Sequence, residues 1–272
     1  RWSAALIVGT VAGLLSITRE NAMIWIALLA IWFIVRFLWK RSTWRHAIAF
    51  ALGVSFILLP VGFRNWKVGG YWSVSTFQAG PNFYIGNHRG ADGRYRPLVR
   101  GHETPQYERA DATSLARRET HRSGHPLPVS RHWMLKGIVE IKRDLRGWLR
   151  LLGYKFLLTL NRYEIADAES VYVHRESSWI LAGLTRTWHL GTLLPLAAIG
   201  VIAARRDRRT WVFASMIASM VAAVAVFYVL GRYRFPIAVL SIPFAALGLV
   251  SLRRAARRKV VGYSLAALVV AV

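Results

Sequence analysis

The sequence has no cysteine and few acidic residues. Without cysteine there can be no disulfide bond and no thiolate metal site, so disulfide-stapled small domains and cysteine zinc fingers are excluded. Only 13 Asp and Glu accompany 37 Lys and Arg, which gives a formal net charge of +24. Such a surplus is typical of nucleic-acid-binding proteins and of membrane proteins whose basic loops set their orientation.

Several catalytic motifs are also missing. The chain has no phosphate-binding P-loop, no G-x-S-x-G nucleophile elbow and no H-E-x-x-H zinc motif. The NTPase, hydrolase and metalloprotease classes that depend on these motifs are therefore excluded. The histidines are scattered at spacings unlike those of a metal site, so the residues themselves predict no metal ligand set.

Apolar residues, by contrast, make up 54% of the chain and gather in long runs. Short basic clusters separate these runs, an arrangement that favours a membrane protein over a nucleic-acid binder. The runs lack the alternation of barrel strands, so they predict membrane helices. The seven runs are Trp2–Ile17, Asn21–Leu38, Ala47–Phe63, Thr187–Ala204, Trp211–Leu230, Phe235–Leu252 and Val260–Val272.

The basic clusters predict how the helices are oriented. Clusters at 36–46, 205–209 and 253–259 are almost free of acid and should face the cytoplasm. We therefore expect an all-α polytopic protein in a bacterial inner membrane, with three spans in 1–63, an extracytoplasmic loop region at 64–186 and four spans in 187–272. Because both ends are apolar, we expect a piece of a longer protein with a truncated seventh span.

The long loop differs from the rest of the chain in its charge. It holds 11 of the 13 acidic residues, counted from Arg64 to Ser178, which is typical of a folded element in water. Within it, about 130–160 predicts one amphipathic helix with Ser130 as N-cap. Its apolar residues recur at helical spacing, and basic residues such as Arg146 and Arg150 lie on the other face. This pattern favours a helix at the membrane interface over one that packs on the core of the loop.

Several arginines should lie at the outer membrane surface, against the usual trend. Arg232 and Arg234 flank Tyr233 in a tight turn, Arg19 lies in another turn, and Arg64 follows the third run. Because guanidinium groups match phosphate oxygens, these residues are candidate ligands for a lipid phosphate. Snorkelling, or pairing with a neighbour such as Glu20, is the alternative.

The stretch "GPNFYIGNHRGADGRYRP", Gly80 to Pro97, combines aromatic rings with hydrogen-bonding side chains. Asn82, Tyr84, Asn87 and Asp92 suit a sugar, whose hydroxyls need donors and acceptors while its C–H face stacks on rings. The alternative is a turn-rich loop held by its own Asn and Gly residues. These residues alone do not separate the two interpretations.

Three segments together resemble bacterial membrane glycosyltransferases of the GT-C superfamily, the relatives of the protein mannosyltransferases and of the aminoarabinose transferase that modifies lipid A. "GLLSITREN" resembles a G-L-x-x-L-T-R-x-N helix pair, "NFYIGN" a loop motif, and "RYRFP" a turn near the family's C-terminus. His88 and Arg89 depart from the loop motif, which leaves the acceptor and the sugar open.

The resemblance implies the C-terminal half of a GT-C-like helix bundle and transfer of a sugar from a polyprenyl-phosphate carrier to a glycan, lipid or protein acceptor. It implies lipid-phosphate contacts at Arg232 and Arg234, matches Arg19 to the arginine of the T-R turn, and implies that Asn82, Tyr84 and Asn87 line the active site. The family's catalytic base belongs to an N-terminal loop with no counterpart here, so no catalytic residue is assigned and this piece is expected to be inactive alone. Some members use a divalent metal; no other cofactor is implied.

Other membrane functions remain alternatives. A polymerase or ligase of polyprenyl-linked glycans would have a similar composition. A lipid or solute transporter is less favoured, because the runs have almost no charge at their centres. A structural membrane protein would not need arginines on the outer face.

Overall fold

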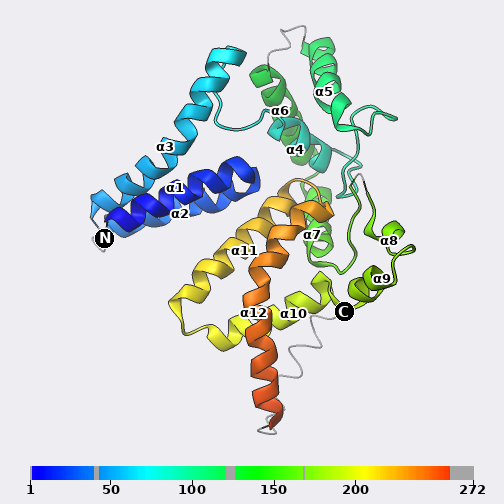
Figure 1. Ribbon diagram of the computed structural model, residues 1–272. Helices are drawn as coiled ribbons and strands as arrows, with labels where there is room; N and C mark the ends of the chain where they lie inside the picture. The colour runs from blue at the N-terminus through cyan, green and yellow to red at the C-terminus, as the bar shows by residue number, and fades with distance from the viewer. Residues whose placement is uncertain (1, 40–42, 121–125, 168, 258–272) are drawn as a thin grey trace. The chain divides into compact units, whose positions relative to one another are not determined.

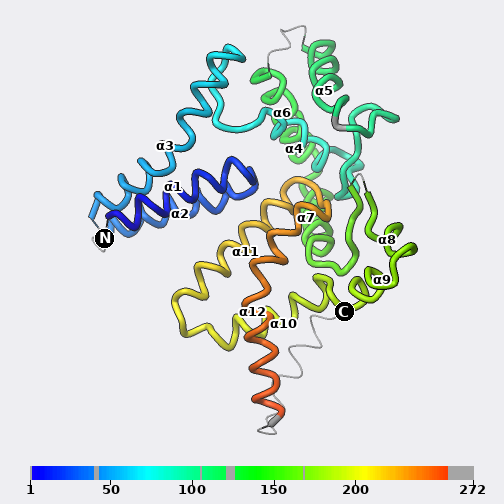
Figure 2. Tube along the Cα trace, viewed as in Figure 1, coloured from blue at the N-terminus to red at the C-terminus, as the bar shows by residue number. Residues whose placement is uncertain are grey.

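The computed structural model describes residues 2–39, 43–120, 126–167 and 169–257, and these contain helices but no strand (Figure 1). Figure 2 traces the same chain as a tube. The helices are α1 (Trp2–Thr18), the 3-10 turn η1 (Glu20–Ala22), α2 (Met23–Leu38), α3 (Trp44–Gly69), α4 (Ala79–Asn87), α5 (Pro105–Thr120), α6 (Pro126–Arg143), α7 (Leu145–Leu160), α8 (Val171–His174), α9 (Trp179–Thr187), α10 (Leu190–Ala204), α11 (Arg208–Val226) and α12 (Gly231–Arg257).

Six of the seven predicted apolar runs are helical. Within the described residues, five helical segments are long and apolar enough to cross a membrane: Glu20–Leu38, Trp44–Gly69, Trp179–Ala204, Arg208–Val226 and Gly231–Ala256. α1 is apolar but shorter, and the seventh run lies outside the described residues. The prediction of an all-helical, polytopic membrane protein is thereby confirmed, while its likeness to one superfamily stays a prediction.

The chain forms two compact units. It passes from one to the other at Pro81–Asn82, at Ala112–Thr113 within α5 and at Trp133–Met134 within α6. The ranges predicted from the sequence, 1–63, 64–186 and 187–272, concern the sides of a membrane rather than packing, so they stay a prediction.

In the first unit, α1 packs along α3. Glycines allow this close approach: a Cβ at Gly9 would lie 2.1 Å from the Phe50 carbonyl oxygen, and one at Gly53 would lie 2.3 Å from that of Leu6. Small residues at such crossings are typical of membrane helices, where van der Waals contact drives association. Next to α1, Glu20 accepts hydrogen bonds from the backbone N–H and the hydroxyl of Thr76, which ties the turn after α1 to the segment after α3.

The second unit contains a similar helix pair. α10 and α12 pack together with Gly200 against the Phe244 carbonyl and Gly248 against that of Leu196. α11 contacts α12 and also α7. The N-terminal ends of α10 and α12 both lie near the residues between α7 and α9. Together these parts of the chain line the pocket described below.

The helix predicted over about 130–160 is two helices. α6 begins at Pro126, so Ser130 lies inside it, and the Ser130 hydroxyl instead accepts a hydrogen bond from the Gly80 backbone N–H. Asp144 separates the two helices and caps α7 by accepting from the Gly147 N–H at 2.8 Å. The single-helix prediction is wrong at this point because an Asp N-cap can start a helix wherever its carboxylate meets the free N–H groups.

Candidate functional site

The second unit has a pocket of about 560 Å³ at the N-terminal ends of α10 and α12. Three parts of the chain form its wall: the segment after α7, the end of α9 with its link to α10, and the start of α12. The lining residues are Arg162, Glu164, Ile165, Ala166, Asp167, Glu169, Val171, Tyr172, Thr185, Trp188, His189, Gly231 and Arg232.

The start of α12 binds the segment after α7 at successive points. The Gly231 N–H donates to the Ile165 carbonyl at 2.9 Å. The Arg234 guanidinium, only 1% exposed, donates to the carbonyls of Asn161 and Tyr163 and lies 3.8 Å from the Glu164 carboxylate. Nη1 and Nη2 of Arg234, which is predicted as a phosphate ligand, thus bind backbone carbonyls and hold one wall of the pocket.

Arg232 has a different environment. Its guanidinium is about half exposed, lines the pocket and forms an ion pair with Asp167 at 2.8 Å. The Arg232 Nη2 donates to the Tyr233 hydroxyl at 3.3 Å, and the Arg232 Cζ lies 5.1 Å from the centre of the Tyr233 ring. A half-exposed ion pair contributes little to stability, so Arg232 can exchange its carboxylate partner for another anion.

The pocket places both charge signs beside an aromatic surface. Burial raises the pKa of Glu164 above its usual value, although the neighbouring side chains Arg234 and His189 oppose that shift. Trp188 is 76% exposed at the rim. Anionic oxygens could contact Arg232, hydroxyls could contact the carboxylates, and an apolar ring face could stack on Trp188.

A chain of contacts joins Arg232 to α4. The Tyr228 ring lies 5.9 Å from that of Tyr233, and the Tyr228 hydroxyl hydrogen-bonds Asn82 Oδ1 at 3.3 Å. Burial is the main reason that the pKa of Tyr228 is raised, so this hydroxyl keeps its proton. The structure therefore brings together three predicted site residues, Arg232, Tyr233 and Asn82, through Tyr228.

The polar stretch from Gly80 to Pro97 begins as a helix, not as the predicted loop. Asn87, at its end, is 3% exposed. Its Nδ2 donates to the carbonyls of Phe83 and Val226, and its Oδ1 accepts from Trp148 Nε1 and Lys155 Nζ. All the hydrogen-bonding atoms of Asn87 are therefore used inside the protein, which favours a packing role over sugar contact.

Lys155 is the fully buried partner of Asn87. Its Nζ also donates to the carbonyls of Gly86 and Phe227, at 3.1 and 2.9 Å. Burial lowers the pKa of this ammonium group to about 8. These bonds connect α4, α7 and the segment that follows α11 at one point.

The other two residues of the predicted sugar loop are also engaged. Tyr84 stacks on His88, and the Lys136 ammonium lies 5.2 Å from its ring centre. Asp92 accepts from the Arg94 N–H and from Arg96. Burial opposes ionisation of Asp92, but these two donors lower its pKa below the usual value, in keeping with the turn interpretation of this segment.

Arg19 and Arg64 belong to the first unit. Arg64 lies within α3, which continues past the predicted end of the third run, and it donates to Asn65 Oδ1 at 3.2 Å. Arg19 precedes η1 and is exposed, while its neighbour Glu20 bonds Thr76 rather than Arg19. Their role in phosphate binding stays a prediction.

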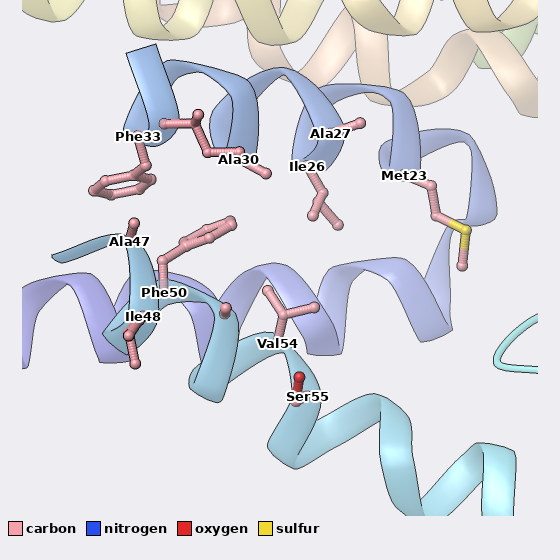
Figure 3. A pocket seen from close by; sticks show the side chains of 12 residues that line it. Met23, Ile26, Ala27, Ala30, Phe33, Ala47, Ile48, Phe50, Val54 and Ser55 are labelled. Atoms are coloured by element: carbon pink, nitrogen blue, oxygen red, sulfur yellow. The ribbon is translucent and has the colours of Figure 1, made fainter. Parts of the chain in front are cut away.

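The first unit also has a pocket of about 560 Å³, between α2 and α3. Figure 3 shows that apolar side chains such as Ile26, Phe33, Phe50 and Val54 line it, with Ser55 at one end. It offers shape and apolar surface but no charged group, so it cannot carry acid–base chemistry.

The sequence interpretation missed Glu164, Asp167, Glu169 and Lys155. The three acids stand within "EIADAE", a run that is unusual in a basic chain and could have signalled a charged pocket. Lys155 had no such signal, because it looks like one more basic residue of an amphipathic helix. Among the described residues no three His, Asp or Glu gather as a metal-binding group, and the use of a divalent metal stays a prediction.

Comparisons with protein-family models, with curated proteins and with solved structures found no match to this chain.

Proposed function

We propose that this chain is part of a membrane glycosyltransferase that takes a sugar from a polyprenyl-phosphate carrier on the extracytoplasmic face. The observation that carries the proposal is the position of Arg232. Its half-exposed guanidinium lines a pocket at the end of a helix that is long and apolar enough to cross a membrane. A phosphate attached to a membrane-embedded chain would reach a protein at this kind of position.

Each part of the pocket has a role in the proposed reaction. The carrier phosphate replaces Asp167 as partner of Arg232, and the sugar hydroxyls bond Glu164 and Glu169 while a ring face lies on Trp188. An acceptor hydroxyl attacks the anomeric carbon and gives its proton to a general base that is not assigned to this chain. The bond to the carrier phosphate breaks, and Arg232 stabilises the charge that grows on the leaving phosphate. Arg234 holds the pocket wall and does not contact substrate.

The test measures transfer of a labelled sugar from a polyprenyl-phosphate donor in membranes that contain the whole protein. Arg232→Gln should lower transfer at least about 100-fold, the scale seen when one charge-stabilising donor is removed. Arg206→Gln, an exposed arginine after α10, is the matched control and should transfer normally. Normal transfer by Arg232→Gln would refute the role of this pocket, and transfer of whole oligosaccharides would instead indicate a polymerase or ligase.

A further inference from the structure

The amphipathic helix α7 has an unusual orientation. Its buried side carries Trp148, Lys155 and Thr159, and the last two are 0% exposed. The bonds from Trp148 and Lys155 to Asn87 fix the rotation of the helix within its unit. The polar residues of α7 therefore do not all face outward. The outward face is the one whose side chains are exposed to solvent.

The outward face of α7 is largely apolar. Leu149 and Leu157 are 53% and 65% exposed, and Leu145 and Phe156 are similarly exposed. At about 100° per residue, Leu145, Phe156 and Leu149 fall within about 40° of one another. A helix of 16 residues is about 24 Å long, shorter than the roughly 30 Å hydrocarbon core. A helix of this length with an exposed apolar face is suited to lie along a membrane surface rather than across it.

Two arginines border this apolar stripe. Arg146 and Arg150 are exposed and stand four residues apart, so their side chains are neighbours. Neither forms a hydrogen bond or ion pair with a described residue. Their neighbour Arg143, by contrast, pairs with Glu140 at 2.9 Å. Two guanidinium groups without a partner in the described part of the chain, beside exposed leucines, suit an anionic phosphate group that is itself attached to apolar chains.

We propose that α7 is a binding surface for anionic phospholipids. Leu145, Leu149 and Phe156 enter the acyl region, and Arg146 and Arg150 bind the headgroup phosphates. The helices long enough to span a membrane place the chain in a bilayer, which supplies this partner. The proposal does not depend on the transferase reaction.

Site-specific fluorescence labelling can test this proposal. Because the chain has no cysteine, a single introduced cysteine is the only thiol that the label can react with. A fluorophore is attached to Leu149→Cys, and to Leu157→Cys in a second preparation, after reconstitution into phosphatidylcholine nanodiscs with a fixed small fraction of brominated lipid. The brominated lipid is phosphatidylglycerol in one arm and phosphatidylcholine in the other. Arg146→Gln/Arg150→Gln removes the pair, and Arg117→Gln/Arg118→Gln on α5 removes the same charge elsewhere.

At about 1 kcal/mol, or fivefold, per surface arginine, brominated phosphatidylglycerol should quench the label several times more than brominated phosphatidylcholine. The Arg146/Arg150 variant should lose this preference, and the Arg117/Arg118 variant should keep it. Equal quenching by both lipids in the wild-type background would overturn the headgroup assignment. A label that neither lipid quenches would show that water or another protein segment covers α7, and would overturn the whole proposal.

Discussion

Lys155 illustrates what burial does to one charged residue. Its ammonium group donates to three backbone carbonyls and Asn87 while fully buried, and its pKa falls to about 8. A lysine whose pKa is lower in the folded than in the unfolded state destabilises the fold below that value. This cost disappears as pH rises from about 8 towards the ordinary value near 10.5.

We therefore predict a pH-dependent difference between the wild-type protein and Lys155→Met. The wild-type protein should gain stability relative to this variant between about pH 7 and about pH 10, by on the order of 2–3 kcal/mol. Thermal unfolding in detergent measures the difference, and Lys142→Met on the exposed side of α6 is the control that should show none. A constant difference across this range would mean that Lys155 keeps an ordinary pKa.

Gly86 allows α4 to pack closely against the segment that follows α11. A Cβ at this position would lie 2.0 Å from the Phe227 carbonyl oxygen, so Gly86→Ala must push the backbone apart. We expect a loss of about 2–4 kcal/mol in unfolding free energy. Gly153→Ala is the matched control, because nothing lies within 4 Å of its Cβ and alanine favours the helix by about 1 kcal/mol. Similar stability of the two variants would contradict the packing described for α4.

At the scale of elements, the first turn of α12 holds the segment after α7 in place through hydrogen bonds. Arg234→Gln should release the carbonyls of Asn161 and Tyr163 and loosen the pocket wall. We expect trypsin to cut after the exposed Arg162 at least about tenfold faster, since local opening becomes easier. Cleavage after Arg175 in the same digest is the internal control, and unchanged cutting at Arg162 would show that Arg234 does not hold this segment.

The same elements show where sequence patterns predict structure and where they do not. Apolar runs predicted six helices, because a bilayer or core requires long apolar stretches whatever their partners. The pattern over 130–160 missed the break at Asp144 and the inward position of Lys155. The inward position of Lys155 depends on partners far along the chain, such as Asn87, that local periodicity does not contain. The break at Asp144 depends on one capping carboxylate within the periodic run. For the same reason the sequence did not show that the side-chain amide of Asn87 is fully hydrogen-bonded within the protein, and its contact with a sugar stays a prediction.

For the whole molecule, the basic clusters predict on which side of the membrane each connection lies. Most residues that line the pocket belong to connections that this rule places outside, 64–186 and 231–234, while 205–209 lies at the other ends of α10 and α11. Because these helices are antiparallel neighbours along the chain, one correct side fixes the others. Labelling one connection on each side of the membrane therefore tests the predicted extracytoplasmic position of the pocket.

We expect a membrane-impermeant maleimide to label Gln106→Cys, between α4 and α6, in intact cells. It should label Arg206→Cys, in the basic cluster after α10, only after the cells are lysed. Both positions are exposed, and the wild-type chain has no cysteine to add background. The Arg206→Cys variant keeps Arg205, Arg208 and Arg209, so its orientation signal persists. The reverse labelling pattern would place the pocket in the cytoplasm, where a donor presented on the outer face could not reach Arg232.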